Sequence, residues 1–193
     1  MASLVLSGDT SGSITVAAPA VAGSTTQTLV NVTGTLAPIV SGTAQASTSG
    51  TSIDFTGIPS WVKRITVMFS GVSTNGTSPY LIQIGGSGGF EASSYAAGAS
   101  TIQGTNATAV TSSTSGFILQ TAAVAASTYS GTVVLTNVSS NTWVTTGAIS
   151  AANGLGLFSN GTKATSTALD RVRITTVNGT DTFDAGTINI LYE

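Results

Sequence analysis

From residue 52 onward, apolar and polar positions alternate in a way that is typical of β-strands. Within residues 62–72, Ile65, Val67 and Phe69 occupy every second position, which places them on one face of an extended strand. The same period of two predicts further strands at residues 53–55, 80–84, 117–119, 132–138, 142–149, 155–158, 171–177 and 187–192. We find no long stretch with the 3.6-residue period of an amphipathic helix. The pattern therefore predicts an all-β fold, an antiparallel, jelly-roll-like β-sandwich of about eight strands.

Glycine-containing sequences separate several of these strands. Asn-Gly pairs at 75–76, 160–161 and 178–179 are the strongest short-range turn signals in the sequence, so we expect a turn at each. The stretch Gly85–Gly89 lacks the lysine and the following helix of a phosphate-binding loop, and it predicts a flexible connection between strands. The predicted core consists of Trp61, Phe69, Ile82, Ile84, Phe117, Leu135, Trp143, Ile174 and Ile188.

The first quarter of the chain has a different character. Residues 1–50 contain one charged residue, Asp9, and no aromatic residue, and their apolar residues come in short clusters. Such a segment cannot build a core of useful size by itself. We therefore expect its apolar side to be covered by the rest of the chain, by sister chains or by a larger particle, and a floppy leader is the alternative.

This contrast predicts two parts: an extended N-terminal attachment and oligomerisation arm, residues 1–50, and a β-sandwich domain, residues 51–193. The stretch 41–51 is typical of a linker. The predicted contact residues of the arm are Leu4, Leu6, Ile14, Val16, Leu29 and Val32.

Composition narrows the possible functions. Charged residues make up 6% of the chain and the net charge is −2, which argues against a basic nucleic-acid surface and a polybasic membrane patch. The absence of Cys and His removes thiolate zinc sites and every Ser-His-Asp scheme. The apolar runs fall far short of the ~20 residues that span a bilayer, so membrane insertion is not expected. The start lacks a basic n-region, so we do not expect a secretory signal.

The acidic residues Asp170, Asp181 and Asp184 are the densest candidates for chemistry. Paired carboxylates could hydrolyse glycosides or bind a cation, but Asp181 follows a predicted turn, where acids commonly make local hydrogen bonds. Arg171 and Arg173 share one strand face and could pair with Asp170, Asp184 or a sister chain, although plain solvation is favoured. We expect no catalytic residues, no metal and no cofactor.

Five polar-tipped aromatic residues could either pack in the core or its rim, which we favour, or stack against sugars. They are Trp61, Tyr80, Tyr95, Tyr129 and Trp143.

Three segments carry a resemblance to a known class of proteins. The opening SLVLSGDTSGSITVAAPAVAGSTTQTL is similar to the N-terminal leader of tailed-bacteriophage virion proteins. The segment SIDFTGIPSWVKRITVMFSGVSTNGTSPYLIQIGGSGG and the ending LDRVRITTVNGTDTFDAGTINILYE resemble a recurring phage β-domain found in tail-fibre or virion structural proteins.

The resemblance implies a non-enzymatic, trimeric virion appendage with an attachment arm and an outward β-domain. The length of the chain fits a head fibre, a capsid decoration or a short tail appendage better than a long tail fibre. Its implied partners are further copies of itself and other capsid or tail proteins, and the resemblance leaves head and tail unresolved. Three functions remain open: a structural virion protein, a host-recognition adhesin that binds cell-surface glycans, and, least favoured, a depolymerase-type enzyme.

Overall fold

The computed structural model of the chain describes residues 3–7, 11, 13–17, 37–103, 106–125 and 127–193. The chain divides into two compact units, Met1–Leu36 and Ala37–Glu193. In the first unit, β1 (Ser3–Ser7) and β2 (Ser13–Ala17) form an antiparallel two-stranded sheet.

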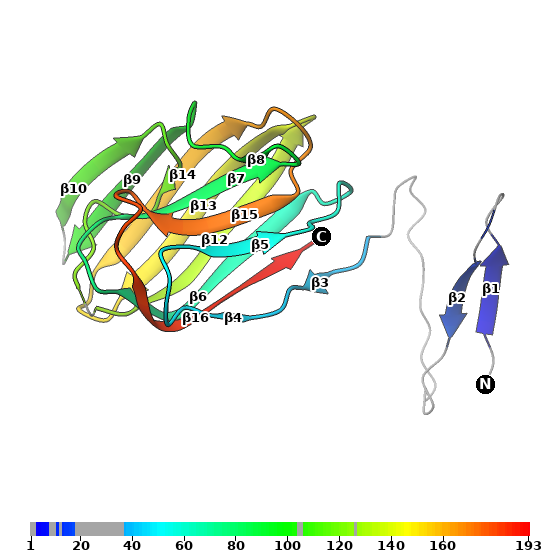
Figure 1. Ribbon diagram of the computed structural model, residues 1–193, viewed down its shortest axis with the longest axis horizontal. Coiled ribbons are helices and arrows are strands. Elements are labelled where there is room, and N and C mark those ends of the chain that lie inside the picture. The colour runs from blue at the N-terminus through cyan, green and yellow to red at the C-terminus, as the bar shows by residue number, and fades with distance from the viewer. Residues whose placement is uncertain (1–2, 8–10, 12, 18–36, 104–105, 126) are drawn as a thin grey trace. The chain divides into compact units, whose positions relative to one another are not determined.

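The second unit is built from two antiparallel sheets, which face each other in Figure 1. The larger sheet has nine strands in the order β10 (Asn106–Ser113), β9 (Ala96–Gln103), β14 (Gly156–Ala164), β13 (Thr142–Ala151), β12 (Tyr129–Ser139), β6 (Arg64–Thr74), β16 (Phe183–Tyr192) and β3 (Val40–Ser41), with β4 (Gln45–Ala46) also paired to β16. The smaller sheet has five strands in the order β11 (Phe117–Ile118), β7 (Tyr80–Gly86), β15 (Arg171–Thr176) and β5 (Ile53–Thr56), with β8 (Gly89–Phe90) paired to β7. The predicted all-β antiparallel sandwich is confirmed, with more strands than the pattern indicated.

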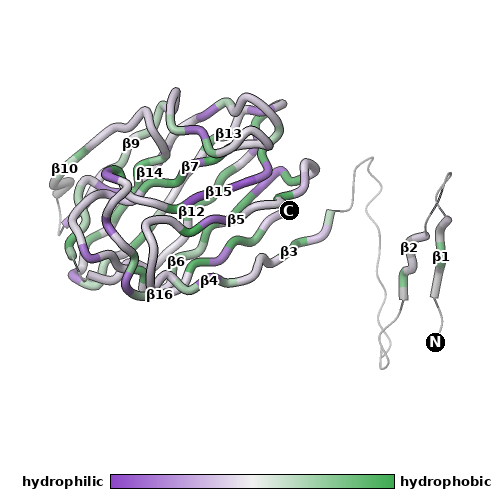
Figure 2. Tube along the Cα trace, viewed as in Figure 1, coloured by the Kyte–Doolittle hydropathy of each residue, from purple (hydrophilic) through white to green (hydrophobic). Residues whose placement is uncertain are grey.

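The core lies between the two sheets and follows the predicted alternation. On β6, Ile65, Val67 and Phe69 are buried, whereas Arg64 is exposed. Figure 2 shows hydrophobic and polar residues following one another along the strands of the sandwich. At one place in the core, Tyr80 packs edge-on against the ring of Tyr129 and stacks with Phe183. Burial of each large side chain of this kind stabilises the fold by about 1.5–3 kcal/mol.

Of the nine predicted core residues, eight are buried and Trp61 is not. Its side chain is 41% exposed, and its ring lies beside that of Tyr192, with the ring centres 6.0 Å apart. Trp61 precedes β6 in the loop after Pro59, so it packs on the rim of the sandwich and not between the sheets.

The sequence pattern does not predict strands β9 (AAGASTIQ) and β10 (NATAVTSS), because small side chains fill much of both and leave no clear alternation of large apolar and polar residues. Pairing decides their structure: β9 joins β14 on one side and β10 on the other. Small side chains on the inner face of β9, such as Ala97 and Ala99, are buried there.

One of the three predicted Asn-Gly turns is wrong. Asn178-Gly179 forms a turn between β15 and β16, with Gly179 at φ +67°, and Asn75-Gly76 lies in the bend after β6. Asn160-Gly161 instead lies in the middle of β14. A Cβ at Gly161 would lie 2.8 Å from the carbonyl oxygen of Ala96, so the glycine permits the close approach of β9.

The prediction of a linker at residues 41–51 is also wrong for its first half. β3 and β4 pair with β16, and the Gly42 amide donates to the carbonyl oxygen of Ile190 over 2.8 Å. Ser47 is fully buried and donates its hydroxyl to the carbonyl oxygen of Ala185. These residues therefore belong to the edge of the larger sheet.

Candidate functional site

The predicted attachment residues lie partly in the β1–β2 hairpin. Leu4 pairs with Val16 across the two strands, and Leu6 pairs with Ile14. The Val16 side chain is 60% exposed. Leu29 and Val32, the other two predicted contact residues, lie outside the described residues.

The glycine stretch 85–89 forms the tight β7–β8 hairpin and is not arranged as a phosphate-binding loop. Gly85 and Gly86 belong to β7, and Gly89 begins β8 at φ +123°. A Cβ at Gly85 would lie 2.8 Å from the Cα of Phe90, and one at Gly86 would lie 2.6 Å from the carbonyl oxygen of Ala168. These glycines are therefore explained by close backbone packing.

The three acidic residues singled out from the sequence do not come together. Asp181 accepts a hydrogen bond from the side chain of Asn178, which is the local bonding that the turn predicted, and a second one from the amide of Ser78, which is distant in the sequence. Asp184 accepts from the hydroxyl of Ser73. Asp170 forms an ion pair with Arg171, with Nε and Oδ1 2.6 Å apart.

Arg171 and Arg173 share one face of β15, as expected. Arg173 pairs with Asp54, a residue that the sequence did not single out, because Arg173 and Asp54 are direct partners in the β15–β5 register. The two hydrogen bonds are 2.8 and 2.7 Å long, a bidentate geometry. The guanidinium of Arg173 also lies 4.1 Å from the ring centre of Phe90.

Lys163 and Glu91 form a second ion pair that the sequence did not indicate. The Lys163 Nζ lies 2.5 Å from Glu91 Oε2, and the two side chains are 4% and 20% exposed. Nζ also lies 5.2 Å from the centre of the Tyr95 ring. Burial alone would raise the pKa of Glu91, but hydrogen bonds from Lys163 and Ser166 outweigh it and lower that pKa below its ordinary value.

These shifts predict how stability depends on pH. The pKa of Asp170 is also lowered, mainly by the hydrogen bond from Arg171. The ionised carboxylates of Glu91 and Asp170 therefore stabilise the fold above about pH 4.5, and this stabilisation is lost as pH falls through their folded-state pKa values. Burial raises the pKa of Tyr95 to about 12 and also raises that of Tyr80, so stability falls again as pH rises above the ordinary value of 10.

We expect a Tm that is flat between about pH 5 and 9 and falls on both sides, measured by thermal melts across this range. A Tm that moves by several degrees between pH 5 and 9 would contradict this account of the charged groups.

One part of the outer face of the larger sheet, formed by β9, β12, β13 and β14, is free of exposed charge in the described residues, whereas β6 and β16 of the same sheet expose Arg64 and Asp184. No charged side chain is exposed on β9, β12, β13 or β14 among the residues that the structure describes. Phe158 and Val144 are exposed on this face, among hydroxyl and other small polar side chains. The ion pairs lie elsewhere: Asp54–Arg173 and Asp170–Arg171 are on or next to β15 of the smaller sheet, and Arg64–Glu193 is at the ends of β6 and β16.

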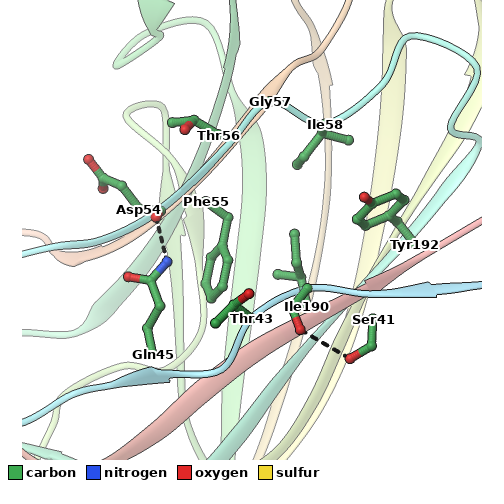
Figure 3. A pocket seen from close by; sticks show the side chains of 11 residues that line it. Ser41, Thr43, Gln45, Asp54, Phe55, Thr56, Gly57, Ile58, Ile190 and Tyr192 are labelled. Carbon is green, nitrogen blue, oxygen red and sulfur yellow. Dashed lines mark hydrogen bonds between the residues drawn. The ribbon is translucent and has the colours of Figure 1, made fainter.

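A cavity of about 380 Å³ opens where the edges of the two sheets meet. We call it the edge cavity; it lies between β3 and β4 of the larger sheet, β5 of the smaller sheet and the end of β16 (Figure 3). Its lining residues are Ser41, Gly42, Thr43, Gln45, Asp54, Phe55, Thr56, Gly57, Ile58, Ile190 and Tyr192.

The edge cavity combines an apolar floor with polar sides. Phe55, Ile58 and Ile190 are buried at its base. In Figure 3, Gln45 and Asp54 lie at one end of it, and Ile58 and Tyr192 at the other. The side-chain amide of Gln45 donates to the carbonyl oxygen of Asp54 over 2.7 Å and so ties the two sheet edges together.

The described residues contain no cluster of three or more potential metal ligands. They also contain no helix with the length and apolar character needed to cross a membrane. Comparison of the chain with models of protein families, with curated proteins and with solved structures found no match.

Proposed function

We propose that the chain is a non-enzymatic structural protein of a bacteriophage virion, exposed on the particle surface as a short homotrimeric fibre or a capsid decoration. The carrying observation is the β1–β2 hairpin. It is a two-stranded sheet within a unit of 36 residues that contains a single charge, and Val5 and Val16 are exposed on it. A two-stranded sheet is marginally stable in water by itself, so the hairpin is suited to being completed by sister chains or by another virion protein.

The charge-free part of the outer face of the larger sheet supports the same proposal. Burial of this face against another protein would desolvate hydroxyl and apolar groups but no ion on β9, β12, β13 or β14. Ions are the groups whose burial costs most without a partner. A charge-poor face is therefore compatible with packing between subunits or on a shell.

Deletion of residues 2–36 tests this proposal. The deletion ends at the boundary between the two units, so β3 and β4 stay on β16. We expect a folded sandwich with nearly unchanged Tm that no longer forms trimers or joins the particle, measured by light scattering and by incorporation into particles produced with the variant.

A longer deletion, of residues 2–46, serves as the control, since it also removes β3 and β4 and should lower the Tm. If the chain without residues 2–36 assembles normally, the arm has no role in attachment and the proposal fails.

A host-recognition adhesin that binds cell-surface glycans is the second candidate function. The observation that favours it is the exposed ring of Trp61, which lies beside the ring of Tyr192. Tyr192 itself lines the edge cavity. Purified adhesin would compete with the particle for the host surface, whereas a purely structural protein would not.

A further inference from the structure

We infer that the edge cavity is a binding site for a neutral saccharide. The inference deepens the second candidate function, and its evidence is the chemistry of the cavity itself. Four features carry it: an apolar floor bordered by aromatic rings, unpaired hydroxyl groups on the walls, the absence of net charge, and the size.

The floor and one end of the cavity match the apolar faces of a sugar ring. Phe55 and Ile190 present carbon surface at the base, and Tyr192 closes one end, with the ring of Trp61 next to it at 6.0 Å. Because Trp61 is 41% exposed, its ring is available to a ligand that extends from the cavity toward solvent. Amphipathic aromatic rings with one apolar face and one wet side suit ligands that are themselves apolar on one face.

The walls carry hydroxyl groups that the fold does not use. None of the described hydrogen bonds involves the side-chain oxygens of Thr43, Thr56 or Tyr192, all of which line the cavity. Gln45 uses its amide nitrogen to bond Asp54, which leaves its carbonyl oxygen as an acceptor. Hydroxyl groups both donate and accept, so this set is complementary to the hydroxyls of a saccharide.

Charge decides between neutral and ionised ligands. Asp54 contributes the one carboxylate in the lining, and its two oxygens are held by Arg173 on the outer side of β5. Figure 3 shows this carboxylate pointing away from the ring of Phe55. No cation lines the cavity, so a phosphate or a sugar acid would lose its hydration there without a compensating partner.

The volume sets the size of the ligand. At about 380 Å³ the cavity lies at the lower end of the range for small-molecule sites, which is room for roughly one or two sugar rings. Its mouth at the sheet edges leaves the remainder of a longer chain in solvent.

An extended peptide is the competing ligand, because β5 is the edge strand of the smaller sheet and could pair with an added strand. The Gln45 side chain already occupies the carbonyl oxygen of Asp54, one of the groups that such a peptide would need. The groups that the cavity offers to a ligand are therefore mainly side-chain hydroxyls and not backbone groups of a strand edge, which favours a saccharide over a peptide.

The test uses the full-length chain on an array of neutral oligosaccharides, acidic oligosaccharides and short extended peptides, followed by calorimetric titration of the best neutral saccharide. We expect Trp61→Ala to weaken binding about tenfold and Thr43→Val about fivefold. Matched controls on the outer face of the larger sheet are Phe158→Ala and Thr146→Val, which remove an exposed ring and an exposed hydroxyl and should change the affinity less than about twofold.

Three results would overturn the inference: binding of no neutral saccharide, preference for acidic sugars or peptides, or binding that neither Trp61→Ala nor Thr43→Val weakens. If the protein binds a neutral saccharide but does not compete with the particle for host cells, the binding site is supported and the adhesin function is rejected. If the protein competes for host cells but binds no saccharide at the edge cavity, the adhesin function is supported and the binding site is rejected.

Discussion

Replacing Glu91 with alanine is expected to lower the free energy of unfolding by about 3–5 kcal/mol, because it leaves a buried ammonium group without its counter-ion. Lys163 is 4% exposed and its Nζ lies 2.5 Å from Glu91. The ring of Tyr95, 5.2 Å away, offers only a weak substitute for a carboxylate. In a domain of this size, the loss corresponds to a fall in Tm of roughly 10 °C, measured by calorimetry or chemical denaturation.

Two controls separate the effect of burial from that of charge. The Arg64–Glu193 pair is more exposed, so Glu193→Ala should cost less than about 1 kcal/mol. The double variant Glu91→Ala with Lys163→Met removes both charges and should be more stable than Glu91→Ala alone. If Glu91→Ala costs no more than Glu193→Ala, the buried pair does not contribute as we describe.

Replacing Gly186 with alanine is expected to destabilise the sandwich by about 3 kcal/mol or more, because the new methyl group would meet backbone atoms of the neighbouring strand. Gly186 has φ +95°, and a Cβ there would lie 2.6 Å from the Cα of Val72 on β6. The pairing of β16 with β6 is irregular at this position, between Ala185 and Thr187. Relief would require β16 and β6 to separate, and denaturant unfolding of the variant measures the cost.

Gly154→Ala is the matched control. Gly154 has a similar backbone angle, φ +84°, but no atom lies within 4 Å of the position its Cβ would take. It should therefore cost only the conformational strain of about 1–2 kcal/mol. Equal losses in the two variants would show that strand contact at Gly186 is unimportant.

The partners in the ion pairs could be predicted from the sequence only in part. Lys163 occupies an inward position, since the alternation of Leu157 and Ser159 continues to it along β14, and that signal could have marked it as buried. Its partner Glu91 lies 72 positions earlier, and no local pattern connects the two. The same holds for Asp54 and Arg173, which the β5–β15 register brings together.

The edge cavity could be predicted from the sequence even less well than the ion pairs. Its walls come from residues 41–45, 54–58 and 190–192, three segments from opposite ends of the domain. The segment around Ser41 was expected to be a linker, because its small polar residues carry no strand signal. It becomes part of the sheet only because β16 offers it an unpaired edge.

The sequence by itself determined the all-β antiparallel class, the faces of strands such as β6 and the low-charge character of the first unit, because burial between two sheets requires a period of two and composition is local. Tertiary structure alone decided the pairing of β9 with β14, the strand position of Asn160-Gly161, the exposure of Trp61 and the edge cavity. These features depend on which distant strands become neighbours, and the free energy of that choice comes from contacts that no single stretch of sequence contains.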